Sequence, residues 1–112
     1  GDFVDRGERS TEVLLALLAL LVAHPDAVHL NRGNHETRAM NRAYGFEEEV
    51  NRKYSRRSFE AFQVAFQALP LATLVNDSAL VMHGGLPERD GVRLADIEAI
   101  DRRHTSADTG LA

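Results

Sequence analysis

The sequence contains no cysteine, which excludes disulfides, thiolate metal sites and a cysteine nucleophile. It also lacks a long hydrophobic run, since the longest, residues 13–23, is too short to cross a bilayer. An excess of basic charge is missing as well: 13 Lys and Arg stand against 17 Asp and Glu, for a net charge of -4. A nucleic-acid-binding domain would usually show a basic face. We therefore expect no nucleic-acid or membrane partner, and a cytoplasmic or nuclear location.

The residues that are present fit one small globular domain of mixed α and β structure. The chain has 112 residues, of which 44% are hydrophobic and 27% charged. Ser10 or Thr11 is a plausible N-cap for the first helix. Asn76-Asp77-Ser78 is a turn sequence between two apolar runs and predicts a hairpin. Apolar spacing and breaker residues predict helices at about 11–24, 36–41, 47–53, 56–69 and 93–103, and strands at 27–31, 71–75 and 79–82.

The segment 56–69 has the clearest amphipathic helical pattern. Its apolar stripe is expected to pack in the core and consists of Phe59, Phe62, Phe66 and Leu69. Glu60, Gln63 and Gln67 are expected on other faces. The run Glu47-Glu48-Glu49 is interpreted as a solvated helix face.

Three glycine-marked segments carry the residues that could perform chemistry. The first block is GDFVDRG (1–7), the second is RGNHE (32–36) and the third is HGG (83–85). Asp2, Asn34 and His83 offer a carboxylate, an amide oxygen and an imidazole, which suit Mn, Fe, Zn or Mg. Two such ions form the usual clamp for phosphoryl hydrolysis. Each residue alone could be structural, but together they favour a metal site, although three ligands cannot fill two coordination spheres.

Three further residues could act on a phosphate group. His35 adjoins Asn34 and could protonate a leaving alkoxide if a carboxylate fixed its tautomer. Asp5 is the candidate for that carboxylate. Arg6 has a planar fork that matches two phosphate oxygens, with a structural salt bridge as the alternative. We expect Arg32 and Glu36 to brace the second block, and His24, His29 and His104 to be structural or surface groups.

These blocks, in this order and spacing, resemble the PPP family of metal-dependent protein serine/threonine phosphatases. YGFEEEV (44–50), Lys53-Tyr54 and residues 66–87 add to the resemblance, which covers residues 1 to about 103 and is nearest the protein phosphatase 5 type. The resemblance implies an α/β, partial calcineurin-like metallophosphoesterase fold, a β-sandwich flanked by helices and truncated at both ends. Residues 1–104 would form the central part of the catalytic domain and 105–112 a loose C-terminal tail.

The resemblance also implies roles for the candidate residues. Asp2 would bridge two divalent metal ions, and Asn34 and His83 would hold the second ion. Asp5 and His35 would form an acid–histidine pair, and Arg6 would bind phosphate. The implied function is hydrolysis of phosphoserine and phosphothreonine in proteins by a metal-bridged water. The resemblance does not indicate which regulatory partners the protein has.

The sequence departs from the family pattern in one respect. The family has an earlier block, resembling GDxHG, which supplies an Asp and a His to the first metal, and no such block occurs here. His104 does not match the context of the family's later histidine. We therefore expect this chain to be a fragment that is inactive alone. Two alternatives stay open: a phosphoesterase acting on small molecules or dinucleoside polyphosphates, and a non-catalytic binding module derived from a phosphatase.

Overall fold

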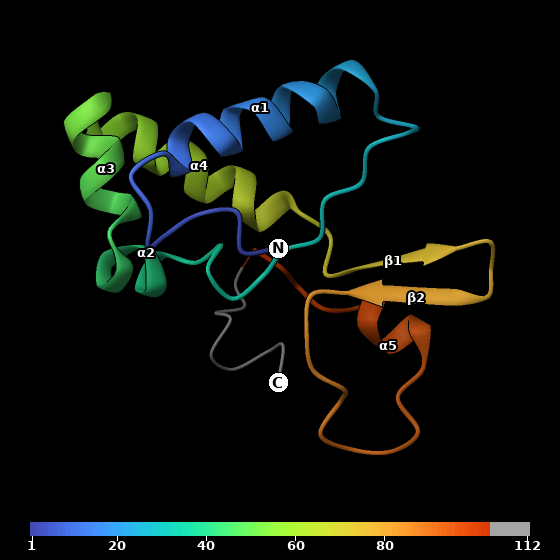
Figure 1. Ribbon diagram of the computed structural model, residues 1–112. Coiled ribbons are helices and arrows are strands. Elements are labelled where there is room, and N and C mark those ends of the chain that lie inside the picture. Colours follow the sequence, from blue (N-terminus) through green and yellow to red (C-terminus); the bar gives the residue numbers. More distant parts are fainter. Residues whose placement is uncertain (104–112) are drawn as a thin grey trace.

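The computed structural model describes residues 1–103, and Figure 1 shows their arrangement. Four helices gather on one side of the molecule, and a two-stranded hairpin with a short fifth helix lies on the other. The expected tail and His104 lie outside the described residues. The elements are α1 (Ser10–Ala23), α2 (Arg38–Tyr44), α3 (Phe46–Lys53), α4 (Arg56–Ala68), β1 (Ala72–Val75), β2 (Ala79–Met82) and α5 (Leu94–Glu98).

The N-terminus of α1 is satisfied by another helix. The predicted N-cap is wrong, because Arg9 occupies that position without a side-chain bond and Ser10 and Thr11 are buried in the first turn. The Glu49 carboxylate of α3 accepts the backbone N–H groups of Ser10, at 3.2 Å, and Thr11, at 3.0 Å. Glu49 is 4% exposed, so the prediction of a solvated glutamate face is wrong at this residue. A carboxylate is favourable there because a helix leaves its first N–H groups unpaired.

A single glycine separates α2 from α3. Gly45 has a φ of 106°, a left-handed conformation that glycine adopts without steric cost. It therefore ends one helix and starts the next. The helix α3 confirms the prediction at 47–53, whereas α2 begins two residues later and ends three residues later than predicted.

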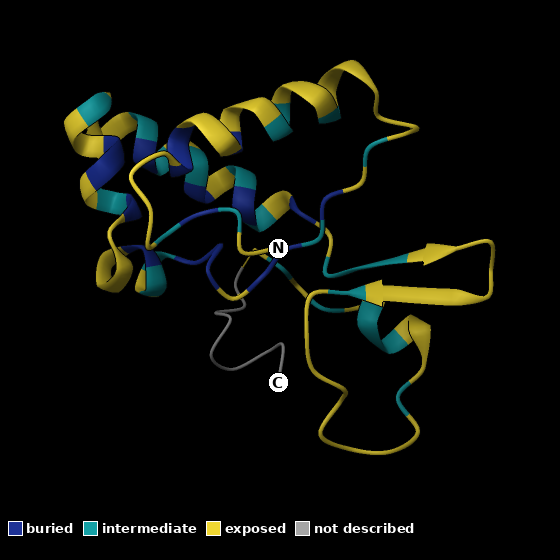
Figure 2. Cartoon of the chain, in the orientation of Figure 1, coloured by how far each residue is buried: buried dark blue, intermediate teal, exposed yellow. Residues whose placement is uncertain are grey.

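The core forms where α3 and α4 cross. The aromatic ring of Phe46 is fully buried, with the rings of Phe62, Phe66 and Phe59 at 5.5, 5.9 and 6.3 Å between centroids. Figure 2 shows the buried residues concentrated in these helices, the start of α1 and the adjoining loops. The predicted stripe of α4 is confirmed as core. Gln63 is an exception to the pattern, because it is 6% exposed and not on a solvated face.

The hairpin is confirmed, with its strands antiparallel and Ala72 opposite Met82. Asn76 and Asp77, each with a φ of 50°, form the turn between β1 and β2, a conformation that Asn and Asp tolerate. Both strands are largely exposed (Figure 2). The helix predicted at 93–103 is shorter than expected, since α5 ends at Glu98. The resemblance implies a β-sandwich, and the part of its sheets found in residues 1–103 is this two-stranded hairpin.

The strand predicted at 27–31 is wrong. The segment begins in a turn, with the N–H groups of Ala27 and Val28 bonded to the carbonyl of His24. Its hydrogen bonds to the hairpin come from the side chain of Asn31, whose Nδ2 donates to the carbonyl of Val81 at 2.9 Å and whose Oδ1 accepts from Thr73 Oγ1 at 2.7 Å. A strand needs a ladder of backbone partners, and no segment among residues 1–103 supplies one for it.

The surface of α1 is unusually apolar for a helix at the edge of a domain. Its exposed side chains include Val13, Leu15, Leu20 and Val22, the last being 81% exposed. In residues 1–103, no helix combines the length and the apolar character that a membrane crossing requires.

Candidate active site

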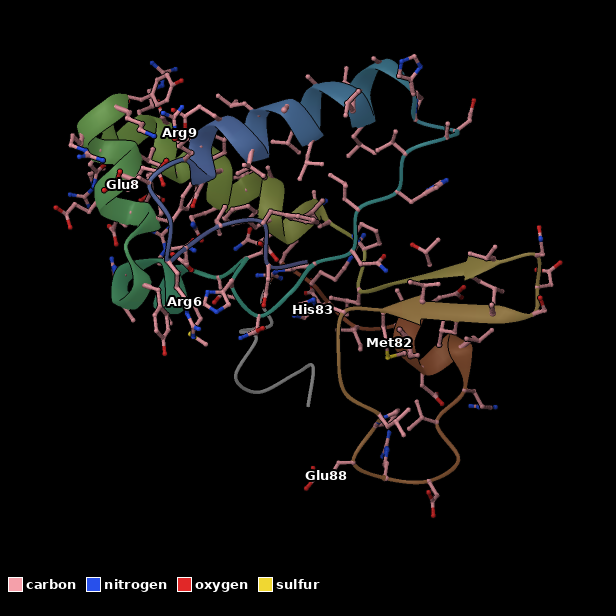
Figure 3. The ribbon with its side chains drawn as sticks, viewed as in Figure 1. Arg6, Glu8, Arg9, Met82, His83 and Glu88 are labelled. Carbon is pink, nitrogen blue, oxygen red and sulfur yellow. The ribbon has the colours of Figure 1, made fainter. Side chains whose placement is uncertain are left out.

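The three glycine-marked blocks meet around Gly1 and Gly33, with His83 of the third block against Gly1. A Cβ added to Gly33 would lie 2.5 Å from Asp2 Oδ1, and one added to Gly1 would lie 2.5 Å from Gly33 Cα and 2.8 Å from His83 Nδ1. These separations are far below van der Waals contact, so no larger residue fits without a shift. Figure 3 shows His83 where β2 ends, near the first residues of the chain, with Arg6 beside α2. The blocks therefore form one site, although up to 82 positions separate them.

Glu36 joins the first and second blocks. Its carboxylate accepts the backbone N–H groups of Asp2 at 2.7 Å, Phe3 at 2.7 Å and Gly33 at 2.8 Å. The residue is fully buried. Hydrogen bonds to a charged acceptor are stronger than neutral ones. Glu36 therefore fixes the two loops against each other, which agrees with the expectation that it braces the second block.

Arg32 supports the same loop from its other side. Its Nε donates to the Glu36 carbonyl at 3.0 Å, and the residue is 6% exposed. Burial lowers the pKa of Arg32, while the nearby charge of Glu36 acts in the opposite direction. These contacts face into the loop, so Arg32 also braces the block. His24 and His29 are exposed, as expected of surface groups.

The first block has an unusual backbone. Asp2, Asp5 and Arg6 have φ values of 59°, 77° and 60°, in the left-handed region that side chains other than glycine rarely occupy. Each such residue costs of the order of 1–3 kcal/mol and persists only where surrounding contacts hold it. Here the Glu36 carboxylate holds the N–H of Asp2, and the Tyr44 carbonyl holds the N–H of Arg6 at 3.1 Å. The strain lies in the segment that presents the candidate side chains.

Of the candidate metal ligands, Asp2 lies against His83, and Asn34 and His83 line the same cavity. Asp2 Oδ1 lies 3.2 Å from His83 Nε2 and also accepts the backbone N–H of His35 at 3.2 Å. Asn34 is exposed and, with His83, lines a cavity of about 700 Å³ that extends between the hairpin and α5. Within residues 1–103, no three His, Cys, Asp or Glu side chains gather as a metal site would require. The oxygen and imidazole donors of Asp2, Asn34 and His83 are of the kinds that bind a divalent cation, and they would supply part of its coordination sphere.

Asp5 and His35 form the expected acid–histidine pair. The Asp5 Oδ2 and His35 Nδ1 atoms are 2.8 Å apart, and their side chains are 0% and 10% exposed. The other carboxylate oxygen accepts the N–H of Phe46 at 3.0 Å, and Asn41 donates to Oδ2 at 3.1 Å. With Nδ1 directed at Asp5, the Nε2 atom is the one left to act on a ligand.

Tyr44 is a site residue that sequence reasoning missed. The guanidinium of Arg6 lies 4.9 Å from the centroid of its ring, and the His35 ring lies 5.2 Å from the same centroid. Tyr44 therefore spaces the candidate phosphate-binding group from the candidate acid. The sequence showed it only as the end of a helix. Its position two residues before the buried Phe46 could not reveal which side chains lie on either side of its ring.

The sequence and the structure define the class of this protein. The sequence model of the family described as Calcineurin-like phosphoesterase matches residues 1–111. The chain belongs to this family, and the expected fold class is confirmed.

Its relatives include named serine/threonine phosphatases. Human serine/threonine-protein phosphatase 5 is 51% identical over 110 residues, covering 98% of this chain and 22% of that protein. Serine/threonine-protein phosphatase T of Saccharomyces cerevisiae is 54% identical over 102 residues, covering 91% of this chain and 20% of that protein. The resemblance inferred from the sequence is thus confirmed. The chain spans about a fifth of the length of these relatives.

A solved structure is similar as well. It is a protein serine/threonine phosphatase from Saccharomyces cerevisiae, described as similar to human phosphatase PP5. Its TM-score is 0.88 at 54% identity, and the match covers 91% of this chain and 32% of that one. The arrangement of α1–α5 and the hairpin is therefore that of part of such a phosphatase.

Proposed function

We propose that this chain belongs to a protein serine/threonine phosphatase that hydrolyses phosphomonoesters of serine and threonine. The observation that carries the proposal is the buried Asp5–His35 pair, set beside Arg6 on one side and the Asp2 carboxylate on the other. A proton donor, a phosphate-binding cation and metal-binding oxygens in one place are the groups that this reaction needs. The printed names of the relatives support the same activity.

We assign Asp2, Asn34 and His83 as the residues that would hold divalent metal ions. The family supports divalent ions, and the donor set is compatible with Mn, Fe, Zn or Mg. When bound, such ions activate water and neutralise phosphate charge. The chain's own contribution is to hold these oxygens and the imidazole at the joined ends of three loops.

Arg6 and His35 act on the substrate itself. The Arg6 fork binds two oxygens of the phosphate, and Tyr44 under the guanidinium limits its rotation. Asp5 holds the His35 ring by Nδ1, so Nε2 faces the leaving group and delivers a proton to the serine or threonine oxygen. Asp5 thus orients the ring, as in other catalytic acid–histidine pairs.

The substrates follow from this chemistry: proteins that carry phosphoserine or phosphothreonine. We place the protein in the cytoplasm or the nucleus, consistent with its lack of cysteine. A fluorescent fusion would show the location directly. Exclusive secretion of the fusion would contradict this placement.

Turnover of defined substrates tests the function. The gene product at its natural length is assayed with Mn²⁺ on a phosphoserine peptide and on a dinucleoside polyphosphate. We expect the peptide to be the better substrate, and Asp2→Asn, His35→Asn and Arg6→Ala to reduce kcat/KM by roughly 10²-fold or more. The exposed His29→Asn is the matched control and should retain activity. Preference for the dinucleotide, or full activity in the three variants, would contradict the proposal.

A further inference from the structure

A chain of buried hydrogen bonds connects α4 with the acid–histidine pair. Gln63 Nε2 donates to Asn41 Oδ1 at 2.7 Å. Asn41 Nδ2 in turn donates to Asp5 Oδ2 at 3.1 Å and to the backbone carbonyl of His35 at 2.7 Å. Asp5 Oδ2 is the oxygen that meets His35 Nδ1. Four residues from four separate segments are therefore joined in one continuous network.

The network lies entirely inside the protein. Asn41 is fully buried, Gln63 is 6% exposed, and the Asp5 side chain is 0% exposed. No buried side-chain polar atom of residues 1–103 lacks a hydrogen-bond partner. An unpaired polar group inside a buried network is destabilising, so few other arrangements of these side chains would satisfy all of their hydrogen bonds. Gln63 is one helical turn from the buried Phe59, so its amide lies on a buried part of α4.

The direction of the bonds matters more than their number. The Asn41 amide has one acceptor end and one donor end, and it faces two acceptors on the Asp5 and His35 side. Gln63 presents a donor to the other end. If Asn41 turned over, its oxygen would face the Asp5 carboxylate and its NH₂ would face the Gln63 donor. The donor of Gln63 and the two acceptors therefore favour the same Asn41 orientation, the one that supports Asp5, and Gln63 holds the Asn41 oxygen in it.

We propose that Gln63 is a positioning residue for the reaction, acting on His35 through Asn41 and Asp5. The inference rests on the proposed role of His35 as the proton donor. Gln63 touches neither substrate nor metal. Its effect is to hold the Asp5 carboxylate in the one position from which it orients the His35 ring.

Two variants alter the network in different ways. Gln63→Met keeps the length of the side chain and removes the donor, so Asn41 Oδ1 loses its hydrogen-bond partner and Asn41 is held less firmly. Gln63→Glu places an acceptor against Asn41 Oδ1, which favours the reversed amide and sets an oxygen against Asp5. The matched control is Gln67→Met, one turn further along α4 and outside the network. A merely structural role of Gln63 predicts loss of stability with no selective effect on proton transfer.

The dependence on the leaving group separates these possibilities. Turnover is measured in the gene product at its natural length, on a phosphoserine peptide and on p-nitrophenyl phosphate. The serine oxygen needs a proton to leave, whereas p-nitrophenolate leaves readily without one. We expect Gln63→Glu to lower kcat on the peptide by roughly 10-fold or more, part of what a general acid contributes. The kcat on p-nitrophenyl phosphate should change by less than about 3-fold, with KM little changed on both. Equal losses on the two substrates would overturn the proposal.

Nuclear magnetic resonance gives a readout that does not depend on activity. The side-chain amide of Asn41 and the Nδ1 proton of His35 are observed with ¹⁵N-labelled asparagine and histidine. We expect both resonances to move in Gln63→Met and Gln63→Glu and to stay in place in Gln67→Met. Unchanged resonances in the first two variants would overturn the inference. If the unmodified protein hydrolysed neither substrate, the proposed function would fail, and the resonances alone would still decide whether Gln63 orients Asn41.

Discussion

Removing the negative charge of Glu36 should loosen the junction of the first two blocks. In Glu36→Gln one carboxylate oxygen becomes an NH₂ group, which cannot accept a hydrogen bond. Oε2 accepts two backbone N–H groups, from Asp2 and Gly33, and Oε1 accepts one, from Phe3. In the best arrangement the remaining oxygen keeps the first two bonds, and the new NH₂ group faces the N–H of Phe3.

The cost of this change can be worked out from the three bonds. One buried donor becomes unpaired, at about 1–3 kcal/mol, and the two remaining bonds lose their charge assistance, at roughly 0.5–1 kcal/mol each. We expect Glu36→Gln to lower the free energy of unfolding by about 3 kcal/mol. That is a large part of the free energy of unfolding of a typical domain, which is about 5–15 kcal/mol.

Urea unfolding followed by far-ultraviolet circular dichroism measures this loss. Glu48→Gln is the matched control, because Glu48 is exposed on α3, and it should change stability by less than about 0.5 kcal/mol. Amide hydrogen exchange should also quicken at Asp2, Phe3 and Gly33 in the Glu36 variant. A cost below about 1 kcal/mol, with exchange unchanged at those three amides, would show that the carboxylate does not hold the loops together.

Three other predictions concern packing and pH. Gly33→Ala places a methyl group 2.5 Å from a carboxylate oxygen of the first block and should cost roughly 1–3 kcal/mol, whereas Gly7→Ala meets nothing within 4 Å and should be neutral in the same urea titration. Phe46→Ala empties the centre of the core and should cost about 3–5 kcal/mol by thermal unfolding; a smaller loss would mean that the neighbouring rings collapse into the space. A hydrogen bond from Lys53 lowers the pKa of Glu12 from 4.5 to about 2, so its stabilisation is complete above pH 4.5 and is lost as the pH falls towards 2. Urea midpoints across this range should lose that slope in Lys53→Met, and an unchanged slope would assign it to other carboxylates.

Much of the fold could be predicted because its signals are local. The i, i+3 and i+7 spacing of Phe59, Phe62 and Phe66 marked α4 and its buried face. Gly45 marked the break between α2 and α3, and the turn sequence at 76–78 marked the hairpin. Each of these patterns depends on neighbours within one or two helical turns or on the conformational freedom of a single residue.

The errors lie where a distant segment decides the outcome. Residues 27–31 have strand composition but no backbone partner within residues 1–103. Glu49 and Gln63 look like solvated helix residues, yet both are buried, because each has a partner on another helix. Composition cannot reveal such partners. The free-energy cost of burying a polar group depends on whether the folded chain supplies a hydrogen-bond partner for it.

The same division holds for the site. The sequence by itself determined the family and the candidate residues. Glycine, acid, amide and histidine occur together in three short blocks, and these residue types indicate a metal and phosphate site without knowledge of the fold. Only the tertiary structure decided how they act together. It placed Asp5 against His35, set Tyr44 between His35 and Arg6, and joined the blocks through Glu36. Most of these contacts join residues 30 or more positions apart, and the contact of His35 with Tyr44 depends on how the backbone turns between them. The geometry of the site therefore exists only in the folded chain.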